Sequence, residues 1–156
     1  MNIRNEREAL SIAVEMEKRA CKTYERAKMM LPTEEMIEAV NDILQDESRH
    51  VVRFQAMLDK AGAGQVDASL VSAMAGVALF PGGVMNMHRE AAFRSVMDLY
   101  KFAAQSEREA VEFYTACADK CESADIAAAF LSIAGEESMH LITLEKTLEK
   151  MKAENK

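Results

Sequence analysis

The segments Glu47-Ser48-Arg49-His50 and Glu137-Ser138-Met139-His140 decide the expected fold, because each carries a Glu-x-x-His motif and the two lie 90 positions apart. Glu17 lies 30 residues before the first motif, and Glu107 lies 30 residues before the second. Four further pairs of identical residues keep the same offset: Ala13 and Ala103, Ala20 and Ala110, Tyr24 and Tyr114, Ser48 and Ser138. The sequence therefore predicts two copies of one helical hairpin.

Composition and apolar spacing predict an all-α chain. Met occurs 12 times and Pro only twice, and the abundant Ala, Leu, Glu and Lys are strong helix formers. Apolar residues recur three and four positions apart, which is the period of a helix with one buried face. They predict four long helices, over residues 6–30, 34–61, 96–119 and 124–151. A residue able to cap a helix stands at each expected start: Asn5, Thr33, Ser95 and Ser123.

The connections between these segments set the expected topology. Residues 31–33 and 121–123 are short turns, so the two helices of each hairpin should be antiparallel. Residues 65–94 are expected to be mostly irregular, with a short apolar helix over 68–79. Helices of about 25 residues are roughly 37 Å long, and a connection of about 30 residues can return along that whole length. The sequence thus predicts a single domain over residues 1–156, an antiparallel four-helix bundle with one long crossover between helices 2 and 3.

The repeated motifs bring carboxylates and imidazoles to one point inside such a bundle. Residues three apart share a helix face, so each Glu-x-x-His projects both side chains the same way. Carboxylate and imidazole suit divalent first-row metals, and the absence of thiolate among them argues against structural zinc or an iron–sulfur cluster. Two divalent cations would also neutralise four buried Glu charges, each of which costs several kcal/mol if unpaired. The expected metal ligands are Glu17, Glu47, His50, Glu107, Glu137 and His140.

A solvated surface would explain single Glu residues, but not the doubled register, since two of only three His fall in the motif. The third, His88, is interpreted as a surface or loop residue. Asp46 and Glu136 occupy matching positions beside the ligands and are candidates for supporting groups. For Tyr24 and Tyr114, hydrogen bonding to ligands and plain core packing are equally good interpretations.

Charge and cysteine content exclude several classes of protein. A net charge of −7 argues against a nucleic-acid or anionic-membrane partner, both of which need clustered positive charge. The chain opens without a signal-peptide pattern and has no apolar run long enough to span a bilayer, so a cytoplasmic location is expected. Cys21, Cys117 and Cys121 form no Cys-x-x-Cys pair, which suits a reducing compartment; the last two are interpreted as free thiols at a helix end.

The paired segments Glu17–Tyr24 and Glu107–Tyr114, with the paired Glu-x-x-His motifs, resemble rubrerythrin, within the ferritin-like superfamily. The resemblance covers nearly the whole chain. It implies a di-iron centre in which Glu47 and Glu137 bridge the irons, Glu17 and Glu107 are terminal ligands, and His50 and His140 each cap one iron. It also implies that these six residues are the catalytic ones, that the chain forms a homodimer, and that hydrogen peroxide or dioxygen is reduced or iron is oxidised there.

Two departures from the family pattern affect that expectation. Two-domain rubrerythrins carry a four-cysteine rubredoxin-like domain that delivers electrons, and this chain has none, so an external donor such as a rubredoxin-type protein is expected. Ala110 stands where those rubrerythrins have an extra Glu that is associated with iron movement during peroxide turnover.

Three functions remain as hypotheses. The first is a non-haem di-iron oxidoreductase of the peroxidase or ferroxidase type. The second is a non-catalytic iron-binding or iron-handling protein, and the third is a structural bundle with a vestigial site. Iron is the expected metal, although manganese and zinc suit the same ligands.

Overall fold

The computed structural model describes residues 4–62, 64–79 and 95–154, which form five helices and no strand. Four of the helices are long and form the bundle, and the fifth is a short segment of the connection between the hairpins. The helices are α1 (Glu6–Lys28), α2 (Glu34–Lys60), α3 (Ala68–Leu79), α5 (Val96–Ala118) and α6 (Ala124–Glu154). The predicted all-α class is confirmed, and so is the short apolar helix of the connection.

Each long helix begins at its predicted cap. The Asn5 side chain accepts from the Glu8 N–H at 2.9 Å, and the Ser95 hydroxyl accepts from the Asp98 N–H at 3.1 Å. Thr33 and Ser123 make the same contact with the backbone three residues on, at 3.3 and 3.4 Å respectively. These bonds satisfy backbone donors that a helix leaves unpaired in its first turn.

Helix ends differ from the prediction by one to three residues. Helix α1 ends at Lys28 rather than Met30, since the N–H groups of Met29 and Met30 bond to carbonyls only three residues back. Helix α6 continues to Glu154, past the predicted Met151, because Lys, Ala and Glu are strong helix formers and nothing breaks the run. Of the connection predicted as irregular, residues 80–94, which include His88, lie outside the described residues.

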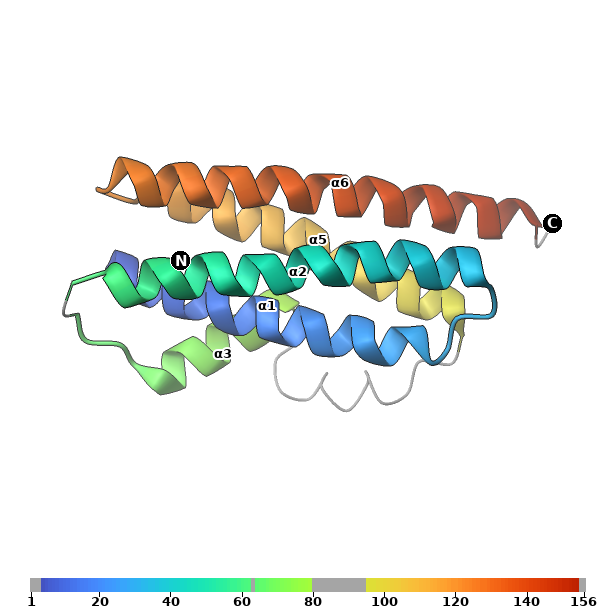
Figure 1. The fold of residues 1–156 in the computed structure, drawn as a ribbon, viewed down its shortest axis with the longest axis horizontal. Coiled ribbons are helices and arrows are strands. Elements are labelled where there is room, and N and C mark those ends of the chain that lie inside the picture. Colours follow the sequence, from blue (N-terminus) through green and yellow to red (C-terminus); the bar gives the residue numbers. More distant parts are fainter. Residues whose placement is uncertain (1–3, 63, 80–94, 155–156) are drawn as a thin grey trace.

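Figure 1 shows the topology directly: α2 and α5 run in one direction, and α1 and α6 run in the other. The chain connects two antiparallel hairpins, α1–α2 and α5–α6, and the crossover between them makes the second and third long helices parallel, as predicted. Helix α3 packs against α1 and α5, and its own Ala75 is fully buried in that contact. No helix among the described residues is both long enough and apolar enough to cross a membrane.

Two apolar clusters fill the bundle, one toward each end. The first includes Leu10, Phe54 and Phe130. The two phenylalanine rings are tilted by 41° with their centroids 5.1 Å apart. The second includes Tyr24 and Leu144. A band of buried polar side chains separates the clusters, so the core is interrupted at mid-length by groups that need partners.

Candidate metal centre

The polar band consists of the six side chains predicted as metal ligands. All are nearly inaccessible to solvent, from 0% exposed for His50 to 6% for His140. They form two groups in which one ligand atom from each residue lies within 4.8 Å of the others: Glu17, Glu47, His50 and Glu137 in one, and Glu47, Glu107, Glu137 and His140 in the other. The structure therefore brings together every residue that the repeat predicted.

Glu47 and Glu137 belong to both groups, while each of the other four belongs to only one. A carboxylate has two oxygens and can bind two cations at once, so these two residues occupy the position of bridges. Each group then offers three carboxylates and one imidazole, a donor set suited to a divalent first-row metal. Sharing two carboxylates between two cations leaves four negative charges against four positive ones.

The imidazoles point their Nδ1 atoms into the cluster. His50 Nδ1 lies 3.0 Å from Glu137 Oε1 and 3.7 Å from Glu17 Oε2. His140 Nδ1 lies 2.9 Å from Glu137 Oε2 and 3.2 Å from Glu47 Oε1. Both rings thus present the same nitrogen to the shared carboxylates.

The opposite nitrogen of each ring contacts a carboxylate from the other hairpin. His50 Nε2 lies 3.2 Å from Glu136 on α6, and His140 Nε2 lies 3.1 Å from Asp46 on α2. With Nδ1 bound to a cation, Nε2 must carry the proton and donate it, which fixes both tautomer and ring orientation. Asp46 and Glu136, predicted only as candidates for support, are therefore placed as the groups that orient the histidines.

The two tyrosines also cross between hairpins. The Tyr24 hydroxyl of α1 donates to Glu107 on α5, and the Tyr114 hydroxyl of α5 donates to Glu17 on α1. Both tyrosines are buried, at 4% and 0% exposure. Of the two interpretations left open by the sequence, hydrogen bonding to the carboxylates is confirmed, and the rings also pack in the core.

Burial and mutual repulsion control the charge of the cluster without a cation. Burial raises the pKa of Glu47 well above its usual value, and the nearby carboxylates of Glu137 and Glu17 raise it further. Burial and Glu137 likewise raise the pKa of Glu107. Burial would also raise the pKa of Glu137, but contacts with His140 and His50 outweigh it and lower that pKa to about 2. Protons therefore take the place of cations in balancing the charge.

Three atoms of the cluster test whether a cation fits. Glu47 Oε1, His50 Nδ1 and Glu137 Oε1 are buried and accept or donate no hydrogen bond. Buried polar atoms nearly always have a partner, and an orphaned atom usually signals a missing ion or water. All three belong to the same group of four ligands, so one divalent cation would satisfy them together. The residues present fit a metal.

A cavity of about 20 Å³ adjoins the carboxylates, which is room for about one water-sized molecule. Its walls include all four Glu of the cluster, both tyrosines, and the matched pair Ala20 and Ala110. Ala110 thus faces the space beside the cluster.

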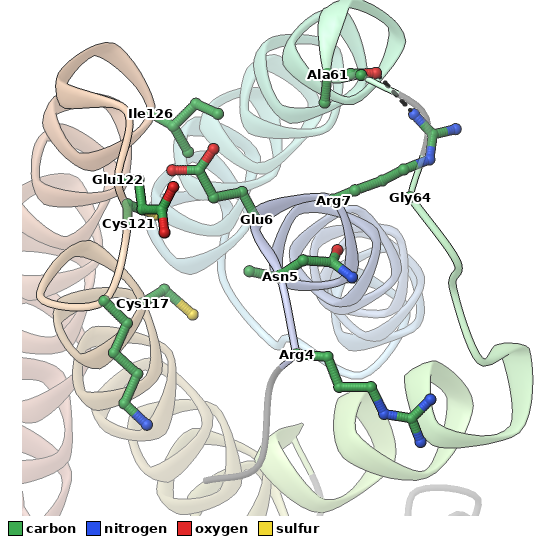
Figure 2. A pocket seen from close by; sticks show the side chains of 13 residues that line it. Arg4, Asn5, Glu6, Arg7, Ala61, Gly64, Cys117, Cys121, Glu122 and Ile126 are labelled. Carbon is green, nitrogen blue, oxygen red and sulfur yellow. Dashed lines mark hydrogen bonds between the residues drawn. The ribbon is translucent and has the colours of Figure 1, made fainter.

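A larger cavity of about 540 Å³ opens at the end of the bundle where α1 begins, and it shares no lining residue with the cluster (Figure 2). Cys117 and Cys121 line it and are free thiols, as predicted. Burial raises their pKa values to about 12 and about 11, so both stay protonated and unreactive near neutral pH. The basic side chain of Arg7 is engaged with the backbone oxygens of Leu58 and Ala61, at 3.0 and 3.1 Å.

One supporting residue was missed by the sequence reasoning. Arg53 on α2 donates to Glu136 at 2.9 Å and to Ser132 at 3.3 Å, so it holds the carboxylate that orients His50. Its counterpart 90 positions on is Thr143, which cannot play the same role. The repeat offset that revealed the other site residues therefore gave no signal for this one.

Comparison with known proteins supports the resemblance. The Rubrerythrin family model matches residues 98–156, which span most of α5 and all of α6 and contain Glu107, Glu137 and His140. A solved structure, the hypothetical protein Pfu-1136390-001 from Pyrococcus furiosus, has a TM-score of 0.71 and 18% identity, covering 93% of this chain and 89% of that one. That likeness shows the fold alone, and no curated protein matches the chain.

The family match suggests a carboxylate protein that binds metal, and iron is the metal it suggests. The two groups of buried ligands described above can hold metal ions. The fold agrees with a ferritin-like bundle. The predicted resemblance to the rubrerythrin family is thereby confirmed, carried by the family match over residues 98–156.

Proposed function

We propose that the chain is a rubrerythrin-like non-haem di-iron oxidoreductase that reduces hydrogen peroxide or dioxygen, or oxidises ferrous iron, with electrons from an external donor. The observation that carries this proposal is the pair of buried ligand groups that share Glu47 and Glu137. Two irons held side by side would supply, by passing between the ferrous and ferric states, the two electrons that reduction of an O–O bond requires.

The six clustered residues are proposed as the metal ligands and the reaction centre. Glu47 and Glu137 would bridge, Glu17 and Glu107 would each bind one ion, and His50 and His140 would each bind through Nδ1. The carboxylates would supply the negative charge that two cations require. Asp46 and Glu136 would hold the imidazoles in place.

The surroundings favour a small oxidant. The adjoining cavity of about 20 Å³ is of the size of a single small molecule such as water, dioxygen or peroxide. Tyr24 and Tyr114 line it and bring two hydroxyl groups to its wall. Each hydroxyl is hydrogen-bonded to a carboxylate, Glu107 or Glu17, and would be placed to supply a proton to a small oxidant in this cavity.

The same proposal includes three expectations from the sequence and the resemblance. They are an external electron donor, a homodimer and a cytoplasmic location. A donor is needed because the three cysteines form no cluster with metal-ligand geometry among the described residues. Non-catalytic iron handling is the alternative, and it differs from catalysis by the absence of repeated turnover.

The test is anaerobic loading with ferrous iron, followed by addition of peroxide in the presence of a reduced rubredoxin-type donor. We expect peroxide to be consumed over many cycles, faster than with free iron, and the Glu47→Ala variant to show only the free-iron rate. Oxidation of the bound iron without re-reduction would favour iron handling. Failure of the protein to retain iron would overturn both functions and favour a structural bundle.

A further inference from the structure

The small cavity beside the carboxylates lies between α1 and α5. All of its described lining residues except Glu47 and Glu137 come from these two helices. Most of them are buried, but Ala20 on α1 and Phe102 and Ser106 on α5 are partly exposed. A cavity comes closest to solvent where its wall is exposed. These three residues therefore mark its mouth, and we use that name for them below.

The repeat supplies an internal control for the mouth. The residues 90 positions away are Ala110, Ile12 and Met16, and all three are buried, with exposures of 6%, 0% and 1%. The two hairpins bring matching ligands to the cluster, so a fully symmetric bundle would have a second, equivalent mouth at these residues. The bundle thus opens toward the cluster on one side of its pseudo-two-fold axis and is closed on the equivalent side.

Helix α3 accounts for the difference between the two sides. It packs against α1 and α5, and in Figure 1 it lies along the half of α1 nearer the start of that helix. Its Ala75 is fully buried in an apolar cluster that also contains Ile12 and Ala110. The crossover between the hairpins therefore closes one of two equivalent openings, and the exposure of the mouth residues shows that the other reaches the surface.

The cavity is also displaced toward the mouth. Ala103 lines it, whereas Ala13, its counterpart 90 positions earlier, does not. Phe102 lines it, and its counterpart Ile12 does not. The empty space beside the cluster therefore extends toward the exposed side and not toward α3.

The chemistry of the mouth favours a small neutral molecule. Ala20 and Phe102 are apolar, and the Ser106 hydroxyl donates to the backbone carbonyl of Phe102 at 3.1 Å. An ion would lose its hydration here without gaining a partner, which is costly, whereas hydrogen peroxide and dioxygen are neutral. A cavity of about 20 Å³ leaves no room for the alkyl group of an organic hydroperoxide.

We propose that the oxidant enters between α1 and α5 through the mouth, and that Ala20 and Phe102 restrict it to hydrogen peroxide or dioxygen and exclude organic hydroperoxides. The inference rests on the proposed oxidoreductase function. When a hydroperoxide is reduced there, it takes up two electrons from the external donor and two protons, its O–O bond breaks, and water and an alcohol leave. With hydrogen peroxide, both products are water.

The size limit is tested with protein that has been loaded anaerobically with ferrous iron. Hydrogen peroxide should oxidise the bound iron at least about 100-fold faster than tert-butyl hydroperoxide does, after division by the same ratio for free ferrous iron. Phe102→Val should speed oxidation by tert-butyl hydroperoxide by about 10-fold and keep the rate with hydrogen peroxide within about two-fold. Equal corrected rates for the two oxidants in the wild type would overturn the restriction.

Ile12→Val is the matched control, because it places the same residue at the equivalent position on the side that α3 covers. It should change neither rate, whereas Ala20→Leu should slow both oxidants by narrowing the mouth. Iron content is measured for each variant, so that a loss of metal is not mistaken for a loss of access. If Ile12→Val admitted tert-butyl hydroperoxide as well as Phe102→Val does, a loosened core and not the mouth would control entry.

Dissolved dioxygen gives a readout that needs neither metal nor turnover. It is paramagnetic, so it speeds the NMR relaxation of the methyl groups that it approaches. In metal-free protein the Ala103 methyl should be affected more than that of the similarly buried Ala13, because only Ala103 lines the cavity. Ala20→Leu should remove this difference.

The two readouts separate this proposal from the function on which it rests. Equal relaxation of Ala103 and Ala13 in the wild type would overturn entry through the mouth, even if the iron-loaded protein reduces peroxide. Stronger relaxation of Ala103 in a protein that shows no turnover would support the mouth and count against the oxidoreductase function alone.

Discussion

The two hairpins agree on the sides that face each other and differ on the sides that face away. Inside the bundle, Glu17 matches Glu107, Glu47 matches Glu137, and each histidine has its counterpart 90 positions on. On the outer sides, several exposed residues of α2 are polar, whereas the residues 90 positions later on α6 are apolar. The inner sides must supply the same ligands to one pseudo-symmetric cluster, whereas each outer side is free to acquire its own role.

A smaller difference appears around the two histidines. Glu136, the carboxylate that orients His50, is itself held by Arg53. Asp46, its counterpart at His140, pairs instead with Arg49 on its own helix. His50 is fully buried and His140 retains 6% exposure, so the equivalent halves of the cluster differ in how firmly each ring is fixed.

The largest expected effect tests whether Glu47 and Glu137 are equivalent. A divalent metal present at about 1,000 times its Kd should stabilise the fold by about 4 kcal/mol, or roughly 10 °C in Tm for a chain of this length. Glu47→Ala and Glu137→Ala should each abolish that increment, because both ion sites use both residues. Thermal unfolding with and without metal measures it.

The exposed Glu112→Ala provides the matched control and should keep the full increment. The metal-free Glu47→Ala protein should be more stable than the metal-free wild type, because it removes a buried carboxyl group that repels its neighbours. If only one of the two bridging positions mattered, the equivalence of the hairpins at the cluster would be wrong.

Next in size is the pH dependence of the metal-free protein. The folded pKa values of Glu47 and Glu107 are raised, mainly by burial, so the folded state binds protons that the unfolded state releases above about pH 4.5. Their contribution to stability is present below that pH and is lost as pH rises. Glu137, with its pKa lowered to about 2, adds stability above about pH 4.5 and loses it only as pH falls toward 2.

Metal-free Tm should therefore fall between pH 5 and 8, while the increment given by metal should grow, since bound metal replaces the protons. Calorimetric scans at several pH values, with chelator and with metal, measure both trends. A metal-free Tm that rises over this range would show that the carboxylates are already ionised in the folded protein.

A third prediction sharpens the difference around the histidines. Glu136→Gln and Asp46→Asn remove the negative charge that orients each imidazole, and each should weaken metal binding by about 10–100-fold. Glu136→Gln should have the larger effect, since Glu136 also holds Arg53 beside the fully buried His50. Metal titration followed by calorimetry gives both constants, and equal losses would mean that the Arg53 contact adds nothing.

The smallest effect concerns the helix caps, which also repeat at an offset of 90. Asn5→Ala and Ser95→Ala should each cost about 1 kcal/mol, or roughly 3 °C in Tm. Asn5→Ala should cost slightly more, because its side chain also donates to the Gln65 carbonyl at 3.3 Å. Chemical denaturation measures both, and a Ser95→Ala variant as stable as the wild type would show that this helix start is fixed by packing alone.

Periodicity and capping chemistry predicted the helices well because both act within a few residues. The four caps and the starts of all long helices agree with the structure, while the ends of α1 and α6 were misplaced by two and three residues. Helix ends fray, and their last turns depend on weak propensities rather than on one strong contact. Arg53 escaped prediction for a different reason, since its partner Glu136 lies on another helix and nothing local marks the pair.

The sequence by itself determined the duplicated hairpin, the helix starts and the identity of the six clustered residues, because a repeat fixes which side chains share a helix face. Only the tertiary structure decided how the hairpins exchange contacts: Tyr24 with Glu107, Tyr114 with Glu17, and each histidine with a carboxylate of the opposite hairpin. Spacing along one helix sets the direction in which each side chain points. The distance between side chains of different helices depends on how the whole core packs. It is that packing which leaves three buried ligand atoms without a partner.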